Sequence, residues 1–203
     1  MLRRLERHLG LHIWSIQTRP LSANFELPPE HAARFTFKRL TLDEALAACE
    51  NQELGMTEEF VRDAFERGDT CVGALENGNL AAYAWRTTTE APVSKGLWIR
   101  LQKPGMTYGY KGFVLPEYRG MRLHYSNTHV GNRYFFDKGN SSNVAYIALH
   151  NLGSMKYASR DPDREYIGFA GYLSFGRHYW TFRTPKVCDF LSLECRRRPA
   201  AVG

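Results

Sequence analysis

The segment that decides the fold is Gly112-Phe-Val-Leu-Pro-Glu-Tyr-Arg-Gly-Met-Arg-Leu-His124. It begins as an aromatic and apolar run, which is typical of a strand, and this strand ends at Pro116. A tight turn through Arg119-Gly120 then enters a helical stretch that extends from about residue 119 to 136. The first backbone N–H groups of a helix lack intrahelical partners and carry the positive end of the helix dipole. This junction is therefore a ready site for a pyrophosphate.

The segments downstream continue the alternation of strand and helix. An apolar run predicts a strand over residues 144–149, and a helix opens at Asn151, where the side chain can cap the first turn. Strand-like segments follow over residues 169–174 and 179–182.

The segments upstream predict one strand and two helices. Residues 34–40 alternate between apolar and polar, which indicates a strand. Thr41 then begins a capping box that Glu44 completes. A second helix begins at Thr57 and ends at Gly68.

A hairpin and two further strands complete the pattern. The runs 71–75 and 80–85 flank Asn77-Gly78, the dipeptide preferred in a two-residue type I′ turn. Strands are then expected over residues 97–101 and 107–115. The order β-α-α-β-β-β-α-β-α-β-β predicts a mixed α/β (α+β) sheet that is covered by helices.

Length and composition favour one soluble folded domain. The chain has 203 residues, of which 43% are hydrophobic and 24% charged, enough to bury a substantial core. The formal net charge of +6 favours anionic partners, such as phosphates, a nucleotide cofactor, an acidic carrier protein or nucleic acid. Charge alone does not choose among them.

Three regions are expected along the chain. Residues 1–33 are interpreted as an N-terminal appendage, because Pro20, Pro28 and Pro29 interrupt it. Residues 34–195 form the folded domain. Residues 196–203 form a basic C-terminal tail that begins with three consecutive arginines.

The cysteines and the hydropathy pattern favour the cytoplasm. The four cysteines are widely spaced without a CxxC pair, so neither a disulfide framework nor a metal site is expected. No window approaches the ~18 apolar residues of a membrane span.

The sequence resembles the GNAT superfamily of N-acetyltransferases. Val114-Leu-Pro-Glu-Tyr-Arg-Gly120 is similar to its strand-to-loop signature, valine-x-proline-x-tyrosine-arginine-glycine. Asn151-Leu-Gly-Ser154, followed by Gly168-Phe169 and Gly171, is similar to the last helix of the family and the strand after it. The resemblance covers about four-fifths of the chain, from Arg34 onward. It implies a twisted, mostly antiparallel sheet with helices on both faces, opened by a V-shaped split that takes the acyl-CoA.

The chain departs from the family pattern in the loop itself. Members usually continue with glycine or another small residue, where this chain has Arg122 and His124. One interpretation is a remodelled phosphate loop in which Arg122 adds a cation. The other is a fold that has lost its cofactor site. The departure also favours an unusual acyl donor, such as a longer acyl-CoA or an acyl chain on a carrier protein.

The resemblance assigns roles to particular residues. The Val114 amide would stabilise the oxyanion that forms on the thioester, and Tyr157 is the candidate general acid for the leaving thiolate. Asn151 would lie beside the pantetheine arm, and Ser154 is a weaker candidate. His124 and His150 are candidate bases, and Tyr83, Trp85, Tyr108, Tyr110 and Lys111 lie on the central strands. The remaining predicted donor-binding residues are Phe113, Leu115, Arg119, Gly120, Met121, Arg122, Leu123 and His124.

The predicted function is N-acyl transfer from acetyl-CoA or another acyl-CoA to the primary amine of a small molecule or protein. The transfer would proceed by direct attack in a ternary complex. One alternative is a long-chain N-acyl amino acid synthase that takes its chain from acyl carrier protein. Another is a non-catalytic binding protein with the same fold. No nucleic-acid motif is present, and exposed sheet edges near the C-terminus are compatible with a homodimer.

Overall fold

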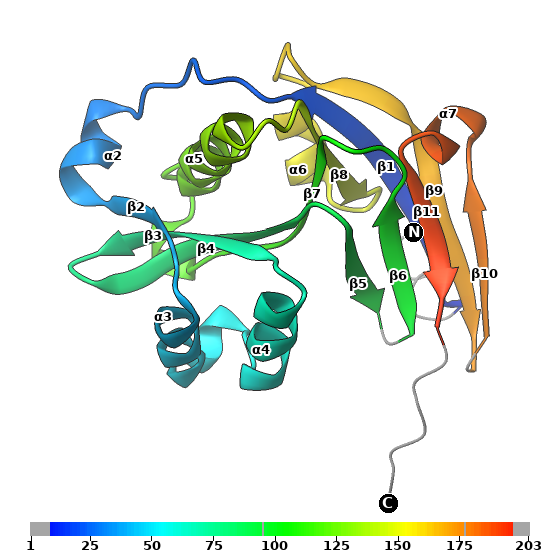
Figure 1. Cartoon of the computed structure of the whole chain (residues 1–203), viewed down its shortest axis with the longest axis horizontal. Coiled ribbons are helices and arrows are strands. Elements are labelled where there is room, and N and C mark those ends of the chain that lie inside the picture. Colours follow the sequence, from blue (N-terminus) through cyan, green and yellow to red (C-terminus); the bar gives the residue numbers. More distant parts are fainter. Residues whose placement is uncertain (1–8, 95, 177, 197–203) are drawn as a thin grey trace, which may run out of the picture. The chain divides into compact units, whose positions relative to one another are not determined.

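The structure, a computed structural model, describes residues 9–94, 96–176 and 178–196, and leaves the Tyr157 side chain undescribed (Figure 1). The chain forms two units. The first contains residues 1–20, 89–108 and 142–203, and the second contains residues 21–88 and 109–141. Each unit is drawn from separate stretches of the chain, so the expected domain over residues 34–195 is divided between them.

The second unit is built on the predicted hairpin. Strands β2 (Thr36–Arg39), β3 (Thr70–Glu76) and β4 (Asn79–Thr87) are antiparallel neighbours in this order. Strand β7 (Met106–Val114) lies beside β4 and contributes Gly109–Val114 to this unit. Asn77 and Gly78 have φ angles of 50° and 84°, which confirms the left-handed turn that the dipeptide predicted.

Helices cover both faces of this sheet (Figure 1). Helices α3 (Leu42–Ala47) and α4 (Glu58–Glu66) lie on one face, and α5 (Leu123–Asp137) lies on the other. The capping box of α3 is confirmed, because Thr41 Oγ1 accepts from the Glu44 N–H at 3.2 Å and Glu44 Oε2 accepts from the Thr41 N–H at 2.9 Å. Thr57 caps α4, as predicted. Short 3-10 turns lie at Ala48–Glu50, Gln52–Leu54 and Pro116–Tyr118.

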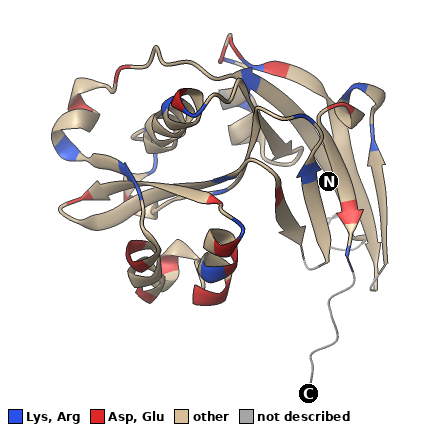
Figure 2. Cartoon of the chain, in the orientation of Figure 1, with Lys and Arg blue, Asp and Glu red and all other residues tan. Residues whose placement is uncertain are grey.

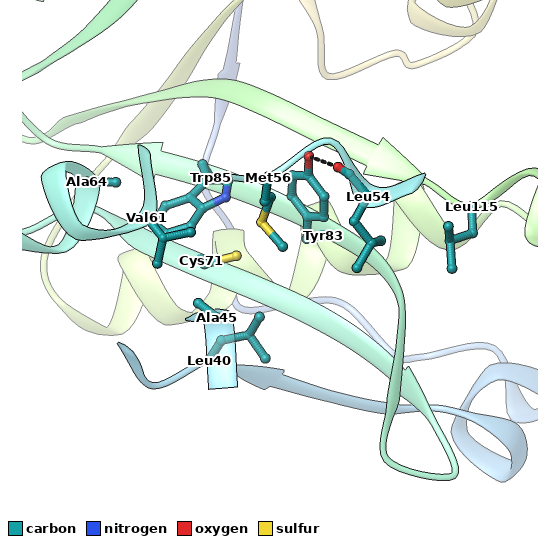
Figure 3. Packing of buried hydrophobic residues seen from close by; sticks show 10 residues of the cluster. All are labelled: Leu40, Ala45, Leu54, Met56, Val61, Ala64, Cys71, Tyr83, Trp85 and Leu115. Carbon is teal, nitrogen blue, oxygen red and sulfur yellow. Dashed lines mark hydrogen bonds between the residues drawn. The ribbon is translucent and has the colours of Figure 1, made fainter. Parts of the chain in front are cut away.

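Figure 3 shows the hydrophobic cluster that lies beneath α3 and α4. Side chains that alternate along β3 and β4, among them Cys71, Tyr83 and Trp85, meet the apolar stripes of the two helices. A smaller cluster on the other face contains Leu123 from the start of α5. The ten residues of the first cluster are Leu40, Ala45, Leu54, Met56, Val61, Ala64, Cys71, Tyr83, Trp85 and Leu115.

The first unit contains two antiparallel sheets. Four strands follow the order β10-β9-β1-β8, and three follow the order β11-β6-β5. Two short helices, α6 (Leu152–Ala158) and α7 (Pro185–Cys188), accompany them. The strands are β1 (Leu11–Pro20), β5 (Glu90–Ser94), β6 (Leu97–Leu101), β8 (Ser142–Ala148), β9 (Glu165–Phe175), β10 (His178–Arg183) and β11 (Leu191–Cys195).

The prediction that residues 1–33 are an appendage is wrong for two of the segments that the structure describes. Residues 11–20 form β1, which lies between β9 and β8, and its residues 14–17 are all buried. The run Trp14-Ser-Ile-Gln17 does alternate between apolar and polar residues, which is a strand signal, but the prolines at 20, 28 and 29 led to the prediction of an appendage. Pro29 does not break a helix but begins α2 (Pro29–Arg34), since proline fits the first helical turn.

The expected basic tail starts later than predicted. Arg196 donates to both carboxylate oxygens of Glu90 at 2.6 Å and to Glu194 at 2.9 Å. Its guanidinium also lies 4.6 Å from the ring centroid of Trp98. Arg196 is therefore part of the folded unit, and the rest of the predicted tail, residues 197–203, lies outside the described residues. No helix in the described part of the chain is long and apolar enough to cross a membrane.

Candidate functional site

The loop between β7 and α5 presents unpaired backbone donors. Two of its N–H groups are used locally, because Arg119 donates to the Pro116 carbonyl at 3.2 Å and Met121 donates to the Tyr118 carbonyl at 3.3 Å. Within the part of the chain that the structure describes, the N–H groups of Gly120, Arg122 and Leu123 have no acceptor. Leu123 is the first residue of α5. Donors and the positive helix end thus occur together, as an anion site requires.

Arg122 has a left-handed backbone, a conformation that favours glycine. Its φ and ψ angles are 60° and 20°, in the left-handed region. A residue with a Cβ adopts this region at an energetic cost. The loop therefore retains a glycine-type backbone, while an exposed arginine side chain extends from it.

The Val114 N–H points away from β4. The next residue, Leu115, donates its N–H to the Ala81 carbonyl at 3.0 Å. Successive peptide groups of a strand bond to opposite sides, so the Val114 peptide faces the other side of β7. The same bond occupies the Leu115 amide, and its side chain is buried in the core. Leu115 is thus a packing residue, and the role of Val114 as an oxyanion donor stays a prediction.

Arg119 adds a positive charge beside this strand end. Its Nε lies 3.4 Å from the Val114 carbonyl oxygen, and its guanidinium lies 5.8 Å from the ring centroid of Phe113. The Phe113 ring in turn stacks on Tyr83, with centroids 6.2 Å apart. The predicted residues Phe113, Val114 and Arg119 are therefore brought together at the end of β7.

His124 lies against the backbone of β7. A Cβ on Gly112 would come within 3.1 Å of the His124 Cε1 atom, so the glycine makes room for the imidazole. This is the second place where the family has a small residue. The imidazole therefore lies beside the strand that carries Val114, so a donor bound along this part of the strand would meet the ring.

Helix α2 contacts the same loop. His31, which is buried, lies 2.7 Å from the Met121 carbonyl oxygen and 2.7 Å from Ser126 Oγ on α5. Arg34 pairs with Glu76, which accepts from the Tyr118 hydroxyl at 2.7 Å. Sequence analysis missed both residues, because their partners are 42 to 95 positions away in the chain.

Asn151 and Ser154 belong to the first unit. The Asn151 Oδ1 accepts from the Ser154 N–H at 3.1 Å, which confirms the predicted helix cap. Tyr157 lies on α6, but its side chain is outside what the structure describes. The contacts of Asn151 and Ser154 with a donor, and the role of Tyr157 as an acid, stay predictions.

Two tyrosines on the central strands act as structural donors. The Tyr83 hydroxyl donates to the Leu54 carbonyl at 2.7 Å (Figure 3), and burial raises the pKa of its phenol. The Tyr110 hydroxyl donates to Asp69 at 2.8 Å, and burial followed by the nearby carboxylate raises its pKa. Both phenols therefore stay protonated at neutral pH, so neither is a base.

Lys111, which is half-buried, and Asp69, which is buried, are charged residues with defined partners. Lys111 Nζ donates to the Gly55 carbonyl at 2.8 Å and lies 4.2 Å from the Phe60 ring centroid, and burial lowers its pKa. Burial raises the pKa of Asp69, although Arg67 and Tyr110 both donate to it. No group of three or more His, Cys, Asp or Glu residues suited to a metal ion occurs within the described ranges.

Among the other named candidates, Tyr108 and Trp85 are fully buried in their units, and His150 follows β8 in the first unit. None of these three positions, as the structure describes them, distinguishes a catalytic role from packing. His124 is the one candidate base that lies at the loop.

Comparison with solved structures identifies this architecture as the fold of the GNAT superfamily, a mixed α/β fold with a mostly antiparallel sheet. A functionally unknown conserved protein from Staphylococcus epidermidis ATCC 12228 aligns with 97% of this chain and 67% of its own, at a TM-score of 0.56 and 10% identity. The aminoglycoside N-acetyltransferase AAC(6')-Iy in complex with CoA aligns over 65% of this chain and 89% of its own, at a TM-score of 0.50 and 16% identity. No known protein-family profile and no curated sequence matches the chain. The likeness establishes the fold.

Proposed function

We propose that this protein is an N-acyltransferase that moves an acyl group, most simply acetyl, from a CoA thioester to a primary amine. The observation that carries the proposal is the junction of β7 and α5. Three unpaired amides at the helix start, those of Gly120, Arg122 and Leu123, lie on the same short segment as the outward-directed Val114 amide. The GNAT fold supports the same class of reaction.

The residues of the loop fit the phosphates of CoA. Backbone donors at a helix start bind phosphate without help from side chains, and Arg119 and Arg122 add two cations in the same segment. The left-handed backbone at Arg122 is one that glycine adopts readily, which supports a loop path compatible with the motif. We therefore infer that the two substitutions in the motif remodel the loop and leave its amides available.

The chemical step would need few protein groups. When bound, the CoA thioester supplies an activated acyl carbon for attack by the acceptor amine. A carbon–nitrogen bond then forms, the carbon–sulfur bond breaks, the amine loses a proton and the sulfur gains one. The Val114 N–H would donate to the thioester oxygen as negative charge develops there. Tyr157 is the candidate proton donor to sulfur.

The transfer can be tested through the Val114 amide. Val114→Pro removes this N–H and spares the ladder bond of Leu115 to β4, because the two groups face opposite sides. Amine-dependent release of free CoA should fall about 100-fold or more, with little change in the Kd for acetyl-CoA. An equally active Val114→Pro variant would contradict the proposed role. Val114→Ala, which keeps the N–H, is the matched control.

A second candidate, a non-catalytic binding protein, is favoured by one observation. The His124 ring lies on the β7 backbone at Gly112, and such a ring would oppose a donor that needs this strand face. His124→Ala separates the two hypotheses. If His124 blocks the site, the variant binds acetyl-CoA and the natural chain does not. If the loop is only remodelled, both proteins bind.

A further inference from the structure

His31 connects the loop to the helix that follows it. The Met121 carbonyl can only accept, so the Nε2–H of His31 donates to it, and in the neutral ring Nδ1 accepts from the Ser126 hydroxyl. His31 is 6% exposed and Ser126 is fully buried. The bond to Ser126 is buried and the bond to the Met121 carbonyl is part-buried, so both are shielded from bulk water to different degrees and are costly to lose.

The acceptor of this bond is the peptide group that joins Met121 to Arg122. In a trans peptide the C=O and N–H point in opposite directions. A fixed Met121 carbonyl consequently fixes the direction of the Arg122 N–H, one of the three unpaired donors of the loop. It also limits rotation of Arg122 out of the left-handed region, where its φ is 60°.

Glycine would adopt this conformation without a side-chain penalty. Arg122 pays such a penalty, so the loop needs support that a glycine loop does not. Helix α2 provides a second attachment, because Arg34 pairs with Glu76 and its Nη1 lies 3.8 Å from the Met121 sulfur. The support is thus concentrated on the residue that precedes Arg122.

We propose that His31 is a positioning residue of the acyl-donor site. It holds the Met121–Arg122 peptide in the orientation that the left-handed backbone of Arg122 requires, and so directs the Arg122 N–H toward the donor phosphate. The ligand part of this inference rests on the proposed function. The conformational part rests only on the contacts of α2 with the loop.

The test compares substitutions at position 31 in two backgrounds at position 122. Arg122→Ala and Arg122→Gly both remove the side-chain charge, but only the glycine also removes the energetic cost of the left-handed backbone. His31→Phe keeps an aromatic ring and loses both hydrogen bonds, whereas His31→Gln keeps an amide donor for the Met121 carbonyl. Calorimetric titration with acetyl-CoA gives the Kd of each protein.

In the Arg122→Ala background, His31→Phe should weaken acetyl-CoA binding about tenfold, as expected for the loss of buried hydrogen bonds. In the Arg122→Gly background the loss should be under about threefold. His31→Gln should restore most of the affinity. Equal losses in the two backgrounds, or no loss in either, would overturn the inference.

Urea unfolding without ligand separates this inference from the proposed function. His31→Phe should lower the unfolding midpoint more in the Arg122→Ala background than in the Arg122→Gly background. Asn127→Leu is the matched control, because it removes a buried 2.8 Å bond from α5 to the Val72 carbonyl, away from the loop. Its effect should be the same in both backgrounds. If the effect of His31→Phe on the unfolding midpoint differs between the two backgrounds but no variant binds acetyl-CoA, only the proposed function is contradicted. If the effect is the same in both backgrounds, the positioning role of His31 is contradicted.

Discussion

Arg122 shows how one residue can depart from a motif and still keep its geometry. The side chain differs from the small residue of the family, but the backbone remains in the left-handed region at φ 60°. Motif matching by residue type registers a mismatch at this position. The structure shows a left-handed backbone, which favours glycine, together with an added cation at this position.

The cost of this backbone is measurable without any ligand. Arg122→Gly should be more stable than Arg122→Ala by about 1 kcal/mol, because a positive φ is sterically unfavourable for alanine and not for glycine. Urea unfolding of the two variants gives the difference. If alanine were equally or more stable, Arg122 would not have this conformation in solution.

Asp69 and Tyr110 predict a pH-dependent contribution to stability. Burial holds the folded-state pKa of Asp69 above its ordinary value of 3.8, so its ionisation costs stability as pH rises through the folded-state pKa. The Tyr110 hydroxyl lowers this pKa and reduces the cost. Tyr110→Phe should therefore destabilise by about 1–3 kcal/mol at pH 7, and by less at pH 4.

The control for this prediction is Tyr83→Phe. Its hydroxyl donates to a backbone carbonyl, which does not titrate, so its cost should be similar at both pH values. Unfolding free energies from urea titrations at pH 7 and pH 4 provide the comparison. A Tyr110→Phe cost that does not change with pH would show that Asp69 is not the titrating partner.

Residue-level features were predictable where both partners are close in sequence. The Thr41–Glu44 capping box, the Asn77-Gly78 turn and the Asn151 cap involve neighbours within three positions. The His31 contacts span 90 and 95 positions, and no local pattern indicates them. Long-range hydrogen bonds depend on the tertiary fold, so the support beneath the loop emerged only from the structure.

At the level of elements, the hairpin and helices of the second unit follow from their sequence patterns, whereas β1 does not. Strand β1 is buried along residues 14–17 and pairs with β8 and β9. Its partners are more than 120 residues away, and it ends at Pro20. The segment was interpreted as an appendage because prolines interrupt residues 1–33, and no local pattern indicates such distant strand partners.

Ile16 tests the structural role of β1. Its side chain is fully buried, so Ile16→Val should cost about 0.5–1.5 kcal/mol and Ile16→Ala about 2–5 kcal/mol. Urea unfolding of both variants shows whether the loss of stability grows with the side-chain volume removed, as expected for a buried residue. An Ile16→Ala cost below about 0.5 kcal/mol would restore the interpretation of this segment as an appendage.

For the whole molecule, net charge is a poor guide to the site. The chain has a formal charge of +6, yet the charged side chains of helices α3 and α4 are mostly acidic (Figure 2). The anionic donor is expected at the start of α5, where Arg119 and Arg122 lie, on the basis of local amides and cations. Composition indicated an anionic partner. The loop sequence and its backbone are the basis on which we propose where that partner binds.

The most direct test of the central claim is thermal unfolding with and without acetyl-CoA, alongside free CoA and palmitoyl-CoA. Acetyl-CoA at about 100 times its Kd should add about 2.7 kcal/mol of stability, a shift in Tm of roughly 5–10 °C. The shift should shrink in Arg119→Glu, which reverses the charge beside Val114. A shift with palmitoyl-CoA alone would indicate a long-chain donor, and no shift with any of the three would contradict a CoA-dependent acyltransferase.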